Sequence, residues 1–214
     1  MATFNSTTFG EISGRHGSAV AAKTKNNGNV LRVYKAPSNP NSVKQIAQRT
    51  KFAFVIAFLG CMRELFKYTF NGNGGFDTAV SYALQNAVTG SSPNWTMDVS
   101  KLVMAVGSDN VYASGTHSVT HTLGSTVKVD WYTGNIHNSQ FDSAKANDTV
   151  TVVFFNEDLR EAMLYEPEVT RIEGTLEVDL PDNWTGGKAH SWLYFTRANG
   201  SINSNSMYLG EVQL

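Results

Sequence analysis

The segment Ser42–Tyr68, with the sequence SVKQIAQRTKFAFVIAFLGCMRELFKY, is the only long helical pattern in the chain. Apolar residues recur at spacings of three or four between Ile46 and Phe66, as one face of a helix requires. Phe54 and Phe58 extend the apolar surface around the back of the helix. Because a helix that is apolar on most sides must be covered on most sides, the pattern predicts a core or docking helix.

Polar and charged residues set the limits of this helix. Ser42 and Gln45 have the spacing of a capping box and mark its expected start. Lys51 and Arg63 bound the apolar run, which is far shorter than the roughly 20 residues that a membrane span needs. We therefore expect no membrane span. The residues expected to anchor packing or docking are Phe52, Phe54, Val55, Phe58, Leu59 and Met62.

A β-hairpin is expected before the helix. Two strand-like runs, residues 18–22 and 29–34, lie on either side of Asn26-Asn27-Gly28. Asn-Gly between extended segments is a strong hairpin signal because both turn positions require positive φ.

A second, shorter helix is expected after the glycine-rich break at residues 71–75. Residues 91–94, Ser-Ser-Pro-Asn, then have the composition of a linker and mark the expected domain boundary. The apolar stripe of the second helix consists of Ala79, Val80, Ala83, Leu84 and Ala87.

From Met97 onward the apolar period becomes two, and turn signals separate short runs. The pattern predicts a mainly β protein with some α-helix, in which an antiparallel β-sandwich of immunoglobulin or fibronectin type follows a β-hairpin and two helices. The expected domains are a basic hairpin and helical region, 1–92, and an acidic sandwich, 97–214. The expected strands are 101–106, 111–114, 118–123, 127–132, 149–155, 161–165, 174–180, 190–196 and 206–212.

Charge is unevenly distributed along the chain. Residues 1–75 carry ten Lys or Arg against two acidic residues, whereas the whole chain has a net charge of −1. Such a division suggests that the two regions attract each other, within or between subunits, or face different partners. The basic residues expected to steer docking are Arg15, Lys23, Lys25, Arg32, Lys35 and Arg49.

The basic hairpin could also follow a phosphate backbone, but Tyr34 is the only aromatic residue among its basic residues. Stacking platforms for single strands are therefore missing, and we favour protein docking over nucleic acid.

His117 and His121 form the most suggestive metal pattern, because residues four apart share a face in a strand or a helix. A zinc site needs further ligands, for which His137, His190 and Asp142 are the candidates. We interpret the two histidines as exposed strand residues and predict no metal, no cofactor and no catalytic residues. No nucleophile elbow or Walker motif is present. The lone Cys61 is expected to be a small buried hydrophobe.

Three sequence segments, GEISGRHGSAV, NPNSVKQIAQRTKF and SNSMYLGEV, occur in an order that resembles a family of uncharacterised proteins of similar length. This family is common in Bacteroidota genomes and their phages. Ser42 stands where its pattern N-P-x-T/S-x-x-Q-x-x-Q-R-x-K-F more commonly has Thr. The resemblance implies a structural or surface role and supplies no catalytic residues.

The expected function is that of a non-enzymatic structural or assembly protein, in a virion or a surface filament, that engages copies of itself or a scaffold. The amino terminus lacks a basic region followed by an apolar stretch, so no signal peptide is expected, and synthesis in the cytoplasm would precede a virion or extracellular location. The alternative is a cell-surface module that binds carbohydrate or protein through exposed Trp95, Trp184 or Tyr208.

Overall fold

The computed structural model describes residues 2–3, 13–24, 28–36, 38–39, 41–70, 74–107, 115–134 and 145–214. The chain separates into two compact units, residues 1–42 and 43–214, which we call the N-terminal unit and the main unit. The domain boundary expected between residues 92 and 97 does not coincide with this division. Both predicted helices share a core with the strands that follow them.

The N-terminal unit is a small antiparallel sheet. Its strands are β1 (Ala2–Thr3), β2 (Gly14–His16), β3 (Ala19–Thr24) and β4 (Gly28–Val33), in the order β1-β4-β3-β2. β3 and β4 pair with Ala19 opposite Val33, which confirms the predicted hairpin. Of the predicted turn Asn26-Asn27-Gly28, Gly28 is the first residue of β4, and residues 26 and 27 lie outside the described residues.

The helical region begins with α1 (Val43–Leu59), followed by the 3-10 turn η1 (Gly60–Met62) and α2 (Leu65–Thr69). The prediction of one continuous helix to Tyr68 is therefore wrong. α1 ends before Gly60, a residue type that costs about 1 kcal/mol relative to Ala within a helix. The periodicity of apolar residues continues across the break because all three elements pack on the same core.

The second predicted helix is confirmed as α3 (Gly75–Asn86). Most of its predicted stripe is fully buried, and Leu84 packs against the same core from a partly exposed position. Lys51 of α1 donates a hydrogen bond to the carbonyl of Leu84 at 2.7 Å, near the end of α3. A cation at this end satisfies a free carbonyl and complements the helix dipole.

Residues 91–94 form a hairpin turn, so the expected linker is wrong. β5 (Val88–Ser91) and β6 (Asn94–Met97) pair in antiparallel fashion around Ser92 and Pro93. The indole of Trp95 donates to the hydroxyl of Thr50 at 3.1 Å, which attaches this hairpin to α1. Ser-Pro is as compatible with a tight turn as with a linker, because neither residue requires a regular element.

The remaining strands form two antiparallel sheets, with the orders β11-β8-β7 and β10-β9-β12-β13. Most predicted strands agree with these to within two residues. Residues 101–106 do not form a strand, and 111–114 lie outside the described residues. The strands are β7 (His117–Leu123), β8 (Thr126–Trp131), β9 (Thr149–Asn156), β10 (Glu161–Tyr165), β11 (Thr175–Asp179), β12 (Lys188–Thr196) and β13 (Met207–Gln213). Three 3-10 turns accompany them: η2 (Val99–Lys101), η4 (Arg171–Glu173) and η5 (Asp182–Trp184).

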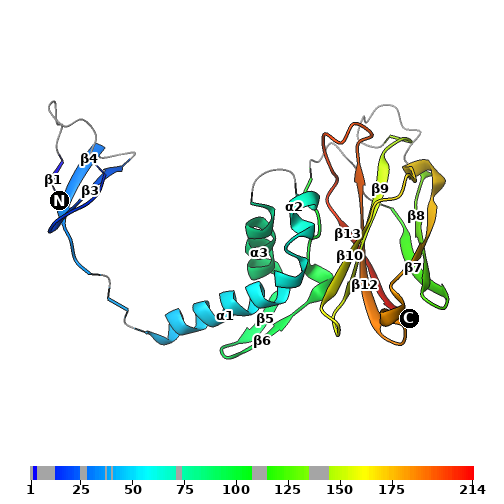
Figure 1. Cartoon of the computed structure of the whole chain (residues 1–214), viewed down its shortest axis with the longest axis horizontal. Helices are drawn as coiled ribbons and strands as arrows, with labels where there is room; N and C mark the ends of the chain where they lie inside the picture. Colours follow the sequence, from blue (N-terminus) through cyan, green and yellow to red (C-terminus); the bar gives the residue numbers. More distant parts are fainter. Residues whose placement is uncertain are drawn as a thin grey trace. The chain divides into compact units, whose positions relative to one another are not determined.

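The main unit is layered, with the helices on one side of the sheet β10-β9-β12-β13 and the sheet β11-β8-β7 on the other (Figure 1). Phe155 and Trp192 belong to the core shared with the helices, whereas Phe154 and Leu193 belong to the core shared with the other sheet. The four-stranded sheet is thus covered on both faces. The predicted mainly β class with antiparallel strands is confirmed.

Candidate functional site

The predicted anchor residues of the long helix are more buried towards its end than in its middle. Val55, Phe58, Leu59 and Met62 are fully buried, and Phe58 meets the ring of Phe155 edge to face at 5.7 Å. These residues attach the end of α1 to the four-stranded sheet within the same chain. Phe54 is partly buried against this core.

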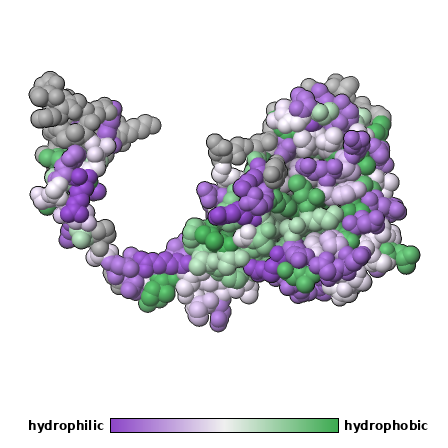
Figure 2. Space-filling model, in the orientation of Figure 1, coloured by the Kyte–Doolittle hydropathy of each residue, from purple (hydrophilic) through white to green (hydrophobic). Residues whose placement is uncertain are grey.

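Phe52 is 46% exposed, which contradicts the expectation that the middle of the helix is covered on most sides. Val43 and Ile46 are also exposed, at the start of α1. Figure 2 shows hydrophobic surface (green) beside strongly hydrophilic surface (purple) along this helix. Because the segment has basic residues and no acidic ones, the exposed part of α1 combines apolar and cationic chemistry.

The N-terminal unit has little core of its own. Among its described residues, Ala21 and Val30 are the buried hydrophobic ones. Leu31 and Val33, on β4, are exposed, and Val33 is 81% exposed. An isolated sheet with so few buried side chains is marginally stable, so this unit gains from a covering surface.

The residues predicted to steer docking are on the surface where they are described. Arg15, Arg32 and Lys35 are exposed in the N-terminal unit, as is Lys23. The guanidinium of Arg15 lies 3.9 Å from the centre of the Tyr34 ring, a cation–π contact that fixes its position. Lys25 lies outside the described residues. Arg49 is exposed on α1.

The histidine pair does not assemble a metal site. Both ring nitrogens of His117 face backbone carbonyls, at 3.0 Å from Gly115 and 3.2 Å from Tyr208. His121 faces the carbonyl of Gly124 at 2.8 Å. Within the described part of the chain, no three His, Cys, Asp or Glu side chains come together in a way that could hold a metal ion.

The other proposed ligands do not join them. His190 lies beside the hydroxyl of Tyr208, at 2.9 Å, and near the carboxylates of Glu157 and Glu211. His137 and Asp142 lie outside the described residues.

His117 also connects two sheet edges. β7 is an edge of the three-stranded sheet and β13 is an edge of the four-stranded sheet. His117 contacts the Tyr208 carbonyl across this gap, and a Cβ added at Gly210 of β13 would lie 3.9 Å from Val119 of β7. The two edges therefore lie against each other along one side of the main unit.

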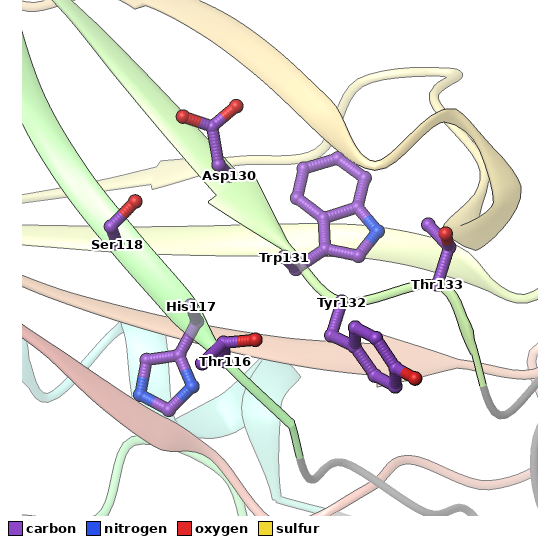
Figure 3. Close-up of a pocket in the computed structure, with 7 residues that line it drawn as sticks. All are labelled: Thr116, His117, Ser118, Asp130, Trp131, Tyr132 and Thr133. Carbon is purple, nitrogen blue, oxygen red and sulfur yellow. The ribbon is translucent and has the colours of Figure 1, made fainter.

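A groove of about 460 Å³ opens beside the line where β7 and β13 meet, which we call the seam. Figure 3 shows its residues just before and at the start of β7, at the end of β8 and on the segment that leaves β8. The residues that line it are Thr116, His117, Ser118, Asp130, Trp131, Tyr132 and Thr133.

Tyr132 is the exposed aromatic residue of this groove, with 49% of its surface exposed. The indole of Trp131, in contrast, is buried in the core and donates to the carbonyl of Arg171 at 2.7 Å. Two glycines make room for Tyr132. A Cβ at Gly115 would lie 2.7 Å from the tyrosine Cβ, and one at Gly134 would lie 2.0 Å from its hydroxyl oxygen.

The Asp130 carboxyl supplies negative charge to the groove. Partial burial acts to raise the pKa of Asp130, but hydrogen bonds from Thr175 and Lys128, with the Lys128 charge, lower it below its ordinary value. Lys128 lies 3.0 Å from the carboxylate. Asp130 is therefore ionised at neutral pH and accepts hydrogen bonds.

The aromatic contacts proposed from the sequence are more covered than expected. Trp184 is buried, and its indole donates to Glu161 at 2.9 Å, so it is a core residue and not an exposed contact. Trp95 and Tyr208 are partly buried. Tyr132 was not among the predicted contacts, although the Tyr-Thr-Gly sequence at 132–134 places an aromatic residue beside a turn glycine.

Cys61 is exposed and not buried as expected. It falls in η1, where the chain has left the helical path of α1, and its thiol lies 3.2 Å from the carbonyl of Phe58.

These features define a mainly β protein whose helices cover one face of a sheet and whose surface has an exposed stretch of basic helix and a groove lined by Tyr132 and hydroxyl groups. The chain belongs to the family of unknown function DUF6266, whose model matches residues 12–210. This match confirms the resemblance to an uncharacterised family. Searches of the curated proteins and of the solved structures gave no match. No helix in the described ranges has the length and apolar character to cross a membrane.

Proposed function

We propose that this protein is a non-enzymatic structural or assembly protein, and that the N-terminal unit of one copy docks on the main unit of a second copy. The setting we propose is a virion or an extracellular filament. The observation that carries the proposal is the N-terminal sheet, which combines an exposed apolar strand with basic side chains and has little core of its own.

Charge complementarity supports a second copy as the partner. The N-terminal unit has five Lys or Arg and one acidic residue, whereas the main unit has twelve Lys or Arg and seventeen acidic residues. Opposite charges steer association and fix its orientation. Docking of one surface on a different surface of the next copy is a head-to-tail contact, which generates rings or open filaments.

The segment between β4 and α1 also supports docking between copies. Its described residues, 34–36, 38–39 and 41–42, are all exposed. Exchange of a terminal element between identical chains is a low-cost route to assembly, because it reuses contacts between existing surfaces.

Light scattering across protein concentration, at low and high salt, tests the proposal. We expect a particle larger than the monomer that dissociates as salt rises, since exposed charges are screened beyond about 8 Å at physiological ionic strength. Reversing Arg32 and Lys35 to Glu should abolish the particle. The matched control reverses Lys67 and Lys101 to Glu. These two exposed residues of the main unit pair with Glu64 and Asp98, respectively. A monomer under every condition would refute the proposal.

We also infer that the two sheets of the main unit form a sandwich of immunoglobulin or fibronectin class. In the immunoglobulin plan the first, second and fifth strands share one sheet, and the third, sixth and seventh share the other. Counted from β7, the orders β7-β8-β11 and β10-β9-β12-β13 follow this plan, with the fourth strand placed beside the third. An experimental structure with a different strand order would refute this inference.

A second candidate function is a cell-surface module that binds carbohydrate or protein. The groove beside Tyr132 favours it, because an exposed aromatic ring lies there among hydroxyl groups and a carboxylate. Pull-down on immobilised polysaccharide by a monomeric protein would favour this candidate over assembly.

A further inference from the structure

The groove at the start of β7 and the end of β8 has the size of a ligand site. Its volume of about 460 Å³ lies within the roughly 300–1,000 Å³ that small-molecule sites occupy. Its lining combines apolar surface with hydroxyls from Thr116, Ser118 and Thr133. Hydroxyl groups both donate and accept hydrogen bonds, so they match a ligand that is itself rich in hydroxyls.

Tyr132 supplies the apolar part of the site. The face of an aromatic ring is electron-rich and attracts weakly positive C–H groups, which one face of a sugar ring presents. The ring is held in place, since Gly115 and Gly134 leave space that any side chain would fill. Gly115 also has a φ of +134°, a conformation that other residues rarely adopt. A fixed platform binds more tightly than a mobile one because less freedom is lost on binding.

The charge of the groove limits the class of ligand. Asp130 contributes a carboxylate, whose Lys128 partner lies 3.0 Å away. Lys128 balances this charge but does not line the groove, whose described lining has a carboxylate and no Lys or Arg, so phosphates, sulfates and acidic sugars find no cationic partner in it. Neutral hydroxyls, in contrast, donate to a carboxylate in a charge-assisted hydrogen bond.

We propose that this groove binds a neutral carbohydrate, with Tyr132 as the stacking platform and Asp130 and Ser118 as hydrogen-bond partners. His117 forms part of the wall, since both of its ring nitrogens already face backbone carbonyls. The inference specifies the second candidate function and is independent of assembly through the N-terminal unit.

Isothermal titration calorimetry of the full chain with three neutral hexasaccharides, cellohexaose, maltohexaose and mannohexaose, tests the site at millimolar ligand. We expect at least one to bind, and Tyr132→Ala to weaken that binding at least tenfold. Tyr132→Phe, which keeps the ring, should retain most of it. The control is Tyr82→Ala, which removes a comparably exposed tyrosine from α3. Gly134→Ala should weaken binding by displacing the ring while circular dichroism stays unchanged.

Three results would overturn the inference: no binding of any of these hexasaccharides, binding that Tyr132→Ala leaves intact, or stronger binding of hexagalacturonic acid. The last would point to an anionic ligand. Light scattering on the same samples reports assembly separately, so a failure of the groove and a failure of the docking proposal can be distinguished.

Discussion

Two antiparallel sheets in this protein each have four strands, yet they differ in how they are covered. In the sheet β10-β9-β12-β13, residues 150–156 of β9 and 189–195 of β12 are all buried, because helices cover one face and a second sheet covers the other. In the N-terminal sheet, Val33 lies in the open at the end of β4. The first sheet is stabilised within the chain. The second is the part of the molecule with most to gain from a partner.

The largest expected effect comes from opening the covered sheet at its centre. Trp192→Ala removes a fully buried indole that packs towards the helices and donates to the carbonyl of Leu102 at 3.1 Å. We expect a loss of roughly 3–5 kcal/mol in the free energy of unfolding, since a site enclosed by packed elements collapses poorly. Urea denaturation of the full chain measures it. A loss below about 1 kcal/mol would mean that the helices do not cover this face.

The next effect concerns the charged group buried beside the same sheet. Asp148 is fully buried, with Arg197 at 3.0 Å and Arg171 at 3.2 Å. Burial lowers the pKa of Arg171 to about 10, although Asp148 acts to raise it, so this arginine stays charged at neutral pH. Asp148→Asn leaves these cations without their counter-charge and should cost about 3 kcal/mol. Thermal unfolding of the Asp148→Asn variant measures this loss as a lower midpoint temperature. A midpoint equal to that of the native chain would contradict the prediction.

A smaller, pH-dependent effect is expected at the edge of the covered sheet. Hydrogen bonds from Trp184 and Asn183 lower the pKa of Glu161 below its ordinary value of 4.5, although burial acts to raise it. A lowered pKa in the folded state gives stability that is complete above the unfolded pKa and is lost as pH falls through the folded one. Between pH 6 and 3, Glu161→Gln should therefore lose less stability than the native chain. Thermal unfolding of both proteins at several pH values measures this difference. If the midpoints of the two proteins fall equally as pH is lowered, Glu161 does not have a lowered pKa in the folded state.

The smallest effect is expected in the uncovered sheet. Val33→Ser replaces an exposed side chain, so the free energy of unfolding should change by no more than about 0.5 kcal/mol. The same change should weaken any assembly through this sheet, which sedimentation velocity would detect. A large loss of stability in a monomer would show that Val33 is already covered and would remove the contrast between the two sheets.

Strands were the most predictable part of the fold. In β8 and β11, buried residues alternate with more exposed ones, so the period of two is visible in the sequence. Residues 101–106 gave a false strand because they are apolar for another reason. Leu102, Met104 and Ala105 are buried in the core that the helices share with the four-stranded sheet. They pack there without forming the hydrogen-bonded pairs of a β-strand.

The candidate site was less predictable. Periodicity across Gly60 suggested one helix, because a 3-10 turn keeps apolar side chains on the same core. Phe52 is exposed although it lies within the apolar run, because the run alone does not show which sides of the helix other elements cover. The groove also depends on Gly115 meeting Tyr132, a contact between residues 17 positions apart in sequence, whereas the contact of Gly134 with the same ring is local.

The contact between the edge strands β7 and β13 has a consequence for strand addition. Strands with free edges can recruit strands from other molecules, which is a route to aggregation. Here two such edges face each other, joined by the contact of His117 with the Tyr208 carbonyl. On the far side of the three-stranded sheet, β11 carries exposed Glu177 and Asp179. Addition of a foreign strand to the three-stranded sheet is thus blocked sterically at β7 and disfavoured by charge at β11.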